Sequence, residues 1–264
     1  MAVFSLYICI GVIAGFLAGL LGIGGGLVIV PALTMIFSHI SFPPEYIVHT
    51  ALGTSLASIV FTSVSSMRTH NSLGGVVWKV VFIITPGIIA GTMTGAWIAS
   101  KLSTSFLKVF FGLFLLYAGT QMLFGIKPKP QRELPEFTGM TAAGSIIGVF
   151  SSLVGIGGGS LSVPFFVWCN TPIHKAIGTS AAIGFPIAVA GSLGYILNGL
   201  GISSMPDFTI GFIHLKSLSG IVMASVLTAP LGAKLAHNLP VDKLKKIFAF
   251  LLYILGLRMI LSIF

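Results

Sequence analysis

Long apolar stretches separated by short polar loops constrain this chain more than any other feature. Several stretches reach about 20 residues, the length that an α-helix needs to cross the hydrocarbon core of a bilayer. Only 7% of the residues are Asp, Glu, Lys or Arg, whereas a soluble domain carries about a quarter. Nearly all of these charges lie between the stretches, where they avoid a cost of about 2.5–3.5 kcal/mol each at the bilayer centre. The sequence therefore predicts an all-α membrane protein, a polytopic helical bundle.

Two motifs occur twice in the same order and divide the chain into related halves. Gly11–Pro31 reads GVIAGFLAGLLGIGGGLVIVP, and Gly144–Pro164, 133 positions later, reads GSIIGVFSSLVGIGGGSLSVP. After each of them comes a second motif, HTALGTS from His49 and HKAIGTS from His174. Such ordered self-similarity indicates an internal duplication.

A polar segment with three prolines and five charges lies between the halves and is typical of an exposed linker. We expect a first transmembrane repeat over residues 1–126, the linker over 127–136 and a second repeat over 137–264. Each half offers five apolar segments, at about 3–21, 27–38, 46–66, 77–99 and 104–125, and at about 138–154, 160–170, 175–198, 212–235 and 246–263. The second of each set is too short for a comfortable span, so it either re-enters or is completed by polar residues. The bundle then has about 8–10 membrane segments, with helices interrupted at GIGGG.

Loop charge favours the re-entrant interpretation, in which each half crosses the membrane an odd number of times. One face then receives ten basic residues: Arg68, Lys79, Lys127, Lys129, Arg132, Lys175, Lys234, Lys243, Lys245 and Lys246. The other face receives four: Lys101, Lys108, Lys216 and Arg258. This asymmetry follows the positive-inside rule, whereas one long helix through each set of glycines nearly removes it. We therefore expect inverted repeats in the cell (inner) membrane, with a cytoplasmic linker and both termini outside.

Glycines serve two different purposes in this chain. Small-xxx-small ladders, which let helices approach closely, occur at positions 11, 15 and 19 and at positions 87, 91 and 95. The triple glycines of the breaks instead interrupt a helix and free amides that need partners in protein or a wet cavity; they are Gly24, Gly25, Gly26, Gly157, Gly158 and Gly159. The short helix after each break points its positive end at the break, which suits an anion. The breaks are therefore either part of a substrate site or structural hinges, and without a following GKS or GKT they are not nucleotide loops.

Hydroxyl groups recur at matching positions in the Gly-Thr-Ser motifs. We interpret these motifs as turns close to a helix start, where Thr54, Ser55, Thr179 and Ser180 donate to a bound substrate. The alternative is that the hydroxyls bond the backbone of their own helix, as is common in membranes.

The titratable residues narrow the substrate class. His49 and His174 precede the Gly-Thr-Ser motifs, with either an interfacial role or a proton-linked or gating role. No acid lies mid-membrane to bind a cation or relay protons, because all five map to loops or loop edges: Glu45, Glu133, Glu136, Asp207 and Asp242. This favours an anionic or neutral substrate held by amides and hydroxyls. No metal cluster or catalytic dyad is recognisable, so we expect no enzyme, metal or cofactor. The net charge of +9 lies in short loops, which argues against nucleic acid.

The paired GIGGG…P segments, each followed by H-x-A-x-G-T-S, resemble the sulfite exporter TauE/SafE family, also called the TSUP permeases. The resemblance covers both halves, although Ser152 stands where the first half has Gly19. It implies a permease for sulfur-containing anions such as sulfite, sulfoacetate or other organosulfonates, without a nucleotide-binding subunit. The implied substrate region is the two triple glycines together with the Thr and Ser of each Gly-Thr-Ser motif.

We expect the two breaks and the two Gly-Thr-Ser motifs to surround one small anion, with the halves rocking around it in alternating access. A passive anion channel is the first alternative, and a membrane scaffold or assembly protein without transport is the second. Besides the substrate, the bilayer is the expected partner, and the sequence is compatible with a homo-oligomer.

Overall fold

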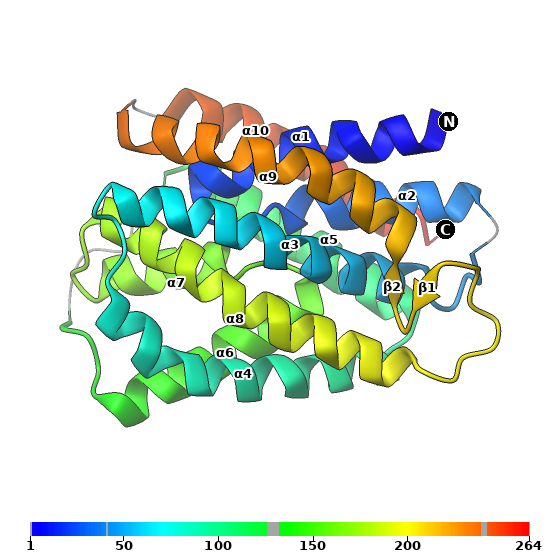
Figure 1. Cartoon of the computed structure of the whole chain (residues 1–264), viewed down its shortest axis with the longest axis horizontal. Helices are drawn as coiled ribbons and strands as arrows, with labels where there is room; N and C mark the ends of the chain where they lie inside the picture. Colours follow the sequence, from blue (N-terminus) through cyan, green and yellow to red (C-terminus); the bar gives the residue numbers. More distant parts are fainter. Residues whose placement is uncertain (1, 41, 126–131, 239–241, 264) are drawn as a thin grey trace.

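The structure of the protein, a computed structural model, describes residues 2–40, 42–125, 132–238 and 242–263. Over these residues the chain forms ten α-helices and one short antiparallel hairpin (Figure 1). The first half contains α1 (Ala2–Leu21), α2 (Gly26–His39), α3 (Ile47–Ser72), α4 (Trp78–Lys101) and α5 (Thr104–Leu123). The second half contains α6 (Phe137–Val154), α7 (Gly159–Trp168), α8 (Ile173–Gly199), β1 (Thr209–Ile210), β2 (Ile213–His214), α9 (Leu215–Asn238) and α10 (Asp242–Leu261). Each predicted apolar segment corresponds to one of these helices.

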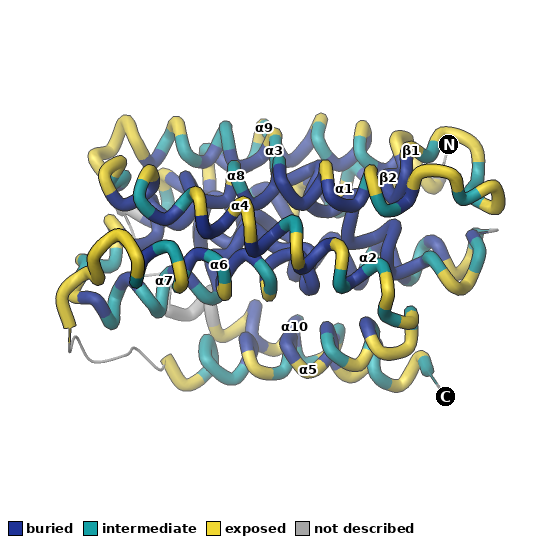
Figure 2. Tube along the Cα trace, turned by 90° about the horizontal axis from the view of Figure 1, so that it is seen from below, coloured by how far each residue is buried: buried dark blue, intermediate teal, exposed yellow. Residues whose placement is uncertain are grey.

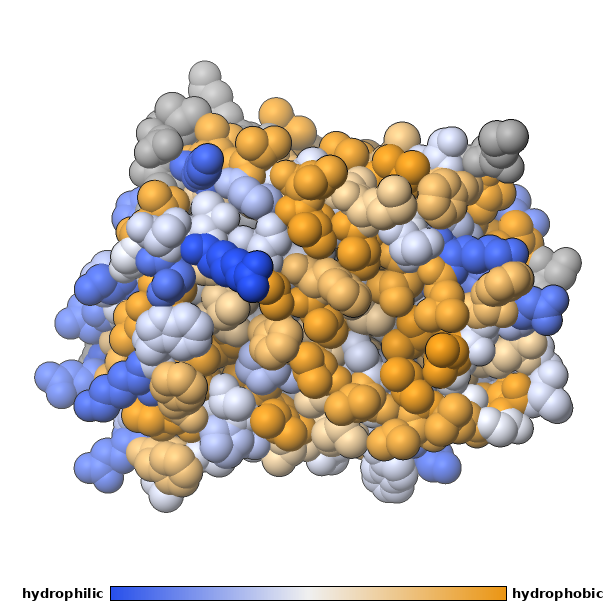
Figure 3. All heavy atoms as spheres, in the orientation of Figure 1, coloured by the Kyte–Doolittle hydropathy of each residue, from blue (hydrophilic) through white to orange (hydrophobic). Residues whose placement is uncertain are grey.

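The surface of the bundle suits a lipid environment. Seven described helices are long and apolar enough to cross a membrane, namely α1, α3, α4, α5, α6, α8 and α9, whereas α2 and α7 are shorter. Large side chains such as Phe82 and Leu227 are 70% and 74% exposed. In Figure 3 apolar residues cover the middle of the face shown, and hydrophilic residues gather towards its left and right ends. A contiguous apolar surface of this kind marks a membrane or interaction surface, and the predicted all-α membrane protein is confirmed.

Helices of one half pack chiefly on helices of the other. The main pairs are α1 with α9, α4 with α6, α3 with α8 and α5 with α10. The glycine ladders explain two of these pairs: a Cβ on Gly19 would overlap the carbonyl oxygen of Ala229 in α9, and one on Gly91 would overlap that of Ser145 in α6. The packing role predicted for the ladders is therefore confirmed.

The pair α3 and α8 forms the centre, and the pair α5 and α10 lies to one side. In α3 and α8, 83% and 67% of the most apolar window is buried, against 39–44% in the other candidate spans. Figure 2 shows α5 and α10 side by side in a layer below the remaining helices. Most of the surface of α3 and α8 is therefore shielded from lipid by the other helices.

Each glycine break reverses the course of the chain. In Figure 1, α2 returns from the break towards the end of the bundle where α1 begins, and α7 returns towards the end where α6 begins. Both described chain ends lie at the right of this view, whereas α5 ends and α6 begins at the left. Positions 127–131 of the expected linker lie outside the described residues, and 132–136 contain no helix or strand.

Candidate functional site

The two glycine breaks adopt the same left-handed conformation at two matching pairs of positions, and they differ at Gly24, which has a φ of 80° whereas Gly157 has no positive φ. Gly22 and Gly155 have φ angles of 68° and 66°, and Gly25 and Gly158 both have 82°. Side chains other than glycine rarely adopt this left-handed region, so these two positions explain why each break needs glycine. Gly25 and Gly158 are also the N-caps of α2 and α7, and neither cap offers a side-chain acceptor. The first amides of both helices therefore lack a side-chain cap.

The breaks of the two halves touch each other at the centre of the bundle. A Cβ on Gly26 would overlap the carbonyl oxygen of Gly155, and one on Gly159 would overlap that of Gly22. These contacts are reciprocal, because Gly26 corresponds to Gly159 and Gly22 to Gly155 in the repeat. The absent side chains allow the two helix starts to cross.

Serines of the central helices hold this crossing. Ser55 on α3 donates a hydrogen bond to the carbonyl oxygen of Gly155 at 2.7 Å, and Ser180 on α8 donates to that of Gly22 at 3.3 Å. Ser180 also shares a hydrogen bond of 2.7 Å with Ser162 of α7. Both Ser55 and Ser180 are fully buried. Each serine thus satisfies a carbonyl group in the break of the opposite half.

Threonines of the same motifs face the loops at opposite ends of the bundle. The hydroxyl oxygen of Thr54 accepts a hydrogen bond from the His214 amide at 2.9 Å, and that of Thr179 accepts one from the Val77 amide at 3.0 Å. His214 directly precedes α9, and Val77 directly precedes α4. Each threonine therefore fixes the start of a transmembrane helix.

The glycines that open these motifs allow the same loops to approach. A Cβ on Gly53 would overlap the carbonyl oxygen of Phe212, and one on Gly178 would overlap that of Gly75. In each half, the Gly-Thr-Ser motif therefore holds a loop at one end of the bundle against the glycine break of the opposite half. We call the two motifs the α3 clamp (residues 53–55) and the α8 clamp (residues 178–180).

The interpretation of these motifs as turns is wrong, because residues 53–55 lie inside α3 and residues 178–180 lie inside α8. Both helices begin six or five residues earlier, at Ile47 and Ile173. A helical conformation is compatible with these hydrogen bonds, because the partners of the hydroxyls come from other segments and the backbone of the motif keeps its own helical hydrogen bonds.

The structure brings the triple glycines, Ser55 and Ser180 together. A cavity of about 10 Å³, room for about one water molecule, lies against the crossing and is lined in part by Gly24, Gly157 and Ser66. The hydroxyl of Ser66 is buried and has no hydrogen-bond partner among the described residues. An oxyanion is larger than water, so the centre must open before an anion can bind there.

The two motif histidines lie outside this centre and differ from each other. His49 is 3% exposed, and its Nε2 lies 3.1 Å from the carbonyl oxygens of both Ala99 and Leu102, at the end of α4. His174 is exposed at the start of α8. In Figure 1 the starts of α3 and α8 lie at opposite ends of the bundle. Their proton-linked or gating role stays a prediction.

Two further residues, which were not predicted, hold the last turns of α1 and α6 just before the breaks. His70 Nε2 lies 2.9 Å from the carbonyl oxygen of Gly19, and the Tyr195 hydroxyl donates to that of Ser152 at 3.0 Å. Both are fully buried. They stand at equal distances after the two clamps, and Gly19 matches Ser152 in the repeat. That shared spacing was the available signal, but the residue types differ.

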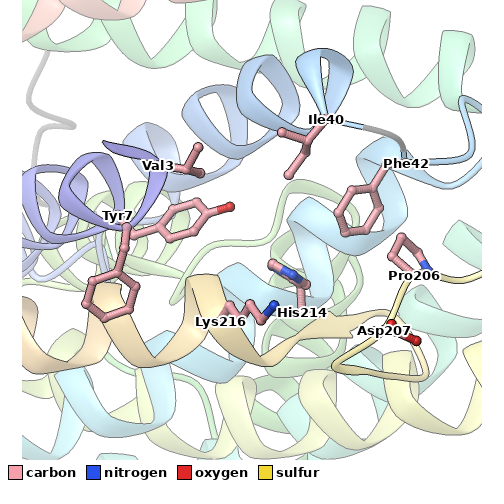
Figure 4. Close-up of a pocket in the computed structure, with 9 residues that line it drawn as sticks. Val3, Tyr7, Ile40, Phe42, Pro206, Asp207, His214 and Lys216 are labelled. Atoms are coloured by element: carbon pink, nitrogen blue, oxygen red, sulfur yellow. The ribbon is translucent and has the colours of Figure 1, made fainter. Parts of the chain in front are cut away.

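A larger cavity of about 480 Å³ opens at the end of the bundle that holds the N-terminus (Figure 4). Its polar groups are Tyr7, Asp207, His214 and Lys216, and its walls include Val3 and Phe42. His214 lies edge-on to Phe42, with ring centroids 5.3 Å apart, and its Nδ1 lies 2.9 Å from the Ser217 hydroxyl. Burial and the nearby Lys216 lower the pKa of His214 to about 4. Because Thr54 binds the His214 amide, the wall of this cavity is joined to the α3 clamp.

Crossed helix breaks buried among helices of membrane length define a polytopic membrane protein with a polar centre. Residues 7–259 match the profile of the sulfite exporter TauE/SafE family. The chain belongs to this family.

Similar proteins agree with that assignment. A probable membrane transporter of Haemophilus influenzae is 38% identical, over 97% of this chain and 98% of its own length. A probable membrane transporter of Methanocaldococcus jannaschii is 30% identical, over 97% of this chain and 95% of its own. No solved structure matches the chain. Family and relatives indicate a membrane transporter rather than an enzyme.

Proposed function

We propose that this protein is a membrane permease for small sulfur-containing anions, such as sulfite or an organosulfonate like sulfoacetate, and that it works by alternating access. The observation that carries the proposal is the reciprocal crossing of the two breaks, held by Ser55 and Ser180. The positive ends of α2 and α7 meet there without a side-chain cap. Such helix starts favour anions, and family membership favours the sulfur class.

Opening is proposed to occur at one clamp at a time. The Thr54 bond to His214 closes the end with the large cavity, and the Thr179 bond to Val77 closes the other end. Each threonine is followed directly by the serine that holds the opposite break. Movement of either loop is therefore passed to the centre through one helix.

The halves are proposed to be inverted repeats in the cell membrane, with the linker in the cytoplasm and both termini outside. What supports this is the course of the chain in Figure 1, where α1 runs from right to left and α6 from left to right. The basic residues expected on the two faces support it as well.

Cysteine labelling tests the orientation. With Cys9 and Cys169 replaced by serine, Ser203→Cys is expected to react with an impermeant maleimide in intact cells, and Ser72→Cys only after lysis. Both positions are exposed, and they belong to opposite ends of the bundle. The reverse pattern would place the linker outside, and labelling of both positions in intact cells would contradict the inversion.

Transport itself is tested with the purified protein. Sulfite, sulfate, thiosulfate and small sulfonates are screened for thermal stabilisation, and the binding anion is then followed in liposomes. A carrier gives saturable flux with counterflow, whereas unsaturated conductance would favour the passive channel. Binding of only carboxylates or cations contradicts the sulfur-anion class. A protein that binds no anion and carries no flux is the scaffold or assembly protein.

Serine variants connect transport with the crossing. Ser55→Ala and Ser180→Ala are expected to weaken anion stabilisation, because both hydroxyls hold the break carbonyls beside the starts of α2 and α7. Ser58→Ala and Ser192→Ala are matched controls, because these buried serines bond only within α3 and α8. Equal effects of all four variants would show that the crossing has no special role.

A further inference from the structure

A second cavity, of about 230 Å³, lies between α2, α5 and α10. Figure 2 shows α10 and α5 as a separate layer below α2. The cavity is near the end of the bundle where α2 and α10 finish and α5 begins. It is separate from the crossing of the breaks and from the cavity of Figure 4, with which it shares no lining residue.

The outer part of this cavity is electropositive. Lys108 from α5 and Arg258 from α10 both line it, and none of the described residues that line it is acidic. The Lys108 ammonium group donates to the backbone carbonyl of Ser262 at 3.4 Å, a neutral acceptor that does not balance the positive charge. Two positive charges that line one cavity favour an anion there.

The polarity of the lining changes along the cavity. On α2 the lining runs from Pro31, Thr34 and Met35 to Ser38 and His39 at the helix end, and the Thr34 hydroxyl is bonded to the Val30 carbonyl of its own helix. On α10, Leu255 is followed in the same direction by Arg258 and Met259, and by Ser262 beyond the helix end. The cavity is thus mainly apolar towards the bundle interior, and both of its basic side chains lie at its outer end. A small inorganic anion would use only the charged end.

We propose that this cavity binds an anionic phospholipid. The headgroup phosphate lies between Lys108 and Arg258, and an acyl chain runs along Pro31, Met35 and Leu255. Basic side chains near a membrane surface attract anionic lipids, and the apolar end of the cavity offers an acyl chain van der Waals contacts. The lipid bridges α2 to the α5–α10 pair, whose helices pack mainly on each other.

The test uses the purified full chain in detergent. Phosphatidylglycerol, phosphatidylcholine with the same acyl chains, and inorganic phosphate are compared by the rise in Tm and by native mass spectrometry. We expect phosphatidylglycerol to raise Tm most and to remain bound. Lys108→Gln combined with Arg258→Gln is expected to weaken its binding about thirtyfold, from the loss of two basic contacts.

Matched variants decide the outcome. Lys101→Gln combined with Lys216→Gln removes two charges from the same end without touching the cavity, and this control is expected to bind phosphatidylglycerol like the wild type. Leu255→Trp fills the apolar end and is expected to release the lipid while keeping both charges. If inorganic phosphate stabilises the protein as much as phosphatidylglycerol does, the cavity is a site for free anions and the proposal is wrong. Binding of phosphatidylcholine as tight as that of phosphatidylglycerol would also overturn the proposal. So would unchanged binding of phosphatidylglycerol to the Lys108/Arg258 variant. If that double variant does not fold, the Leu255→Trp result decides alone.

Discussion

The α3 clamp and the α8 clamp share a backbone plan but differ in the polar groups around them. In both, glycine admits a loop, threonine binds a loop amide and serine binds the opposite break. Ser180, however, also bonds Ser162, whereas the matching position in the first half is Ile29. The duplicated backbone contacts are therefore what both halves require, and the side-chain chemistry is free to diverge.

The two ends of the bundle differ in the same way. The residue held by the α3 clamp is His214, in the wall of a cavity of about 480 Å³, and the residue held by the α8 clamp is Val77. Only the first of these can change its charge. We therefore expect substitutions of the glycines to have equal effects at matching positions of the two halves, and substitutions of polar side chains to have unequal effects.

The largest expected effects are symmetric. Gly26→Ala and Gly159→Ala place a methyl group on a carbonyl oxygen of the opposite break. Because both neighbours are backbone, we expect each variant to lose at least about 3 kcal/mol of stability. Yield of monodisperse protein and Tm in detergent measure it.

Gly74→Ala is the control, since a Cβ there meets nothing within 4 Å and only its φ of 69° is strained. Its cost is about 1 kcal/mol. A wild-type Tm for Gly26→Ala alone would break the equivalence of the two halves.

Lowering the pH is expected to destabilise only the end of the bundle that contains His214. The pKa of His214 is lowered to about 4, below the value of about 6.5 in an unfolded chain. The unfolded state therefore binds the proton first, and stability falls as the pH drops from about 6.5 towards 4, by on the order of 2 kcal/mol. The charged groups that share its cavity are Lys216 and Asp207, with Tyr7 also in the lining.

Thermal unfolding at pH 7 and pH 4.5 measures this loss. His214→Gln should reduce the difference in Tm between the two pH values, whereas His39→Gln, on an exposed residue of α2, should keep it. An unchanged difference in His214→Gln would assign the acid response to another group.

The serines are expected to have smaller and unequal effects. Ser55→Ala removes a hydrogen bond of 2.7 Å and leaves the Gly155 carbonyl group without that partner, at a cost of about 1 kcal/mol. Ser180→Ala removes a longer bond of 3.3 Å and should cost less. Unfolding of both variants, beside Ser58→Ala, measures the difference. An equal or larger loss for Ser180→Ala would show that its contact with Ser162 dominates.

Much of this architecture follows from local sequence, and the clamps do not. The apolar stretches predict the helices, and the ladders at 11, 15 and 19 and at 87, 91 and 95 predict close packing, because helix length and small residues act locally. The clamps contact backbone groups of Phe212, Gly75 and the breaks, and a backbone group gives no sequence signal that would pair it with a particular clamp. The prediction of turns is wrong for this reason, because the loops that the motifs bind are distant from them in the sequence.

The threonines give the smallest effect and the most direct view of the two ends. Thr54→Val and Thr179→Val each remove one acceptor from a buried loop amide while keeping the side-chain shape. We expect about fivefold faster hydrogen exchange at His214 in the first variant and at Val77 in the second, each without change at the other end. Hydrogen exchange with mass spectrometry measures both loops in one sample. If each clamp closes its own end, the two responses stay separate in the resting protein. Faster exchange at both ends in either variant would mean that the clamps release together, which is a property of a channel rather than of a carrier that alternates.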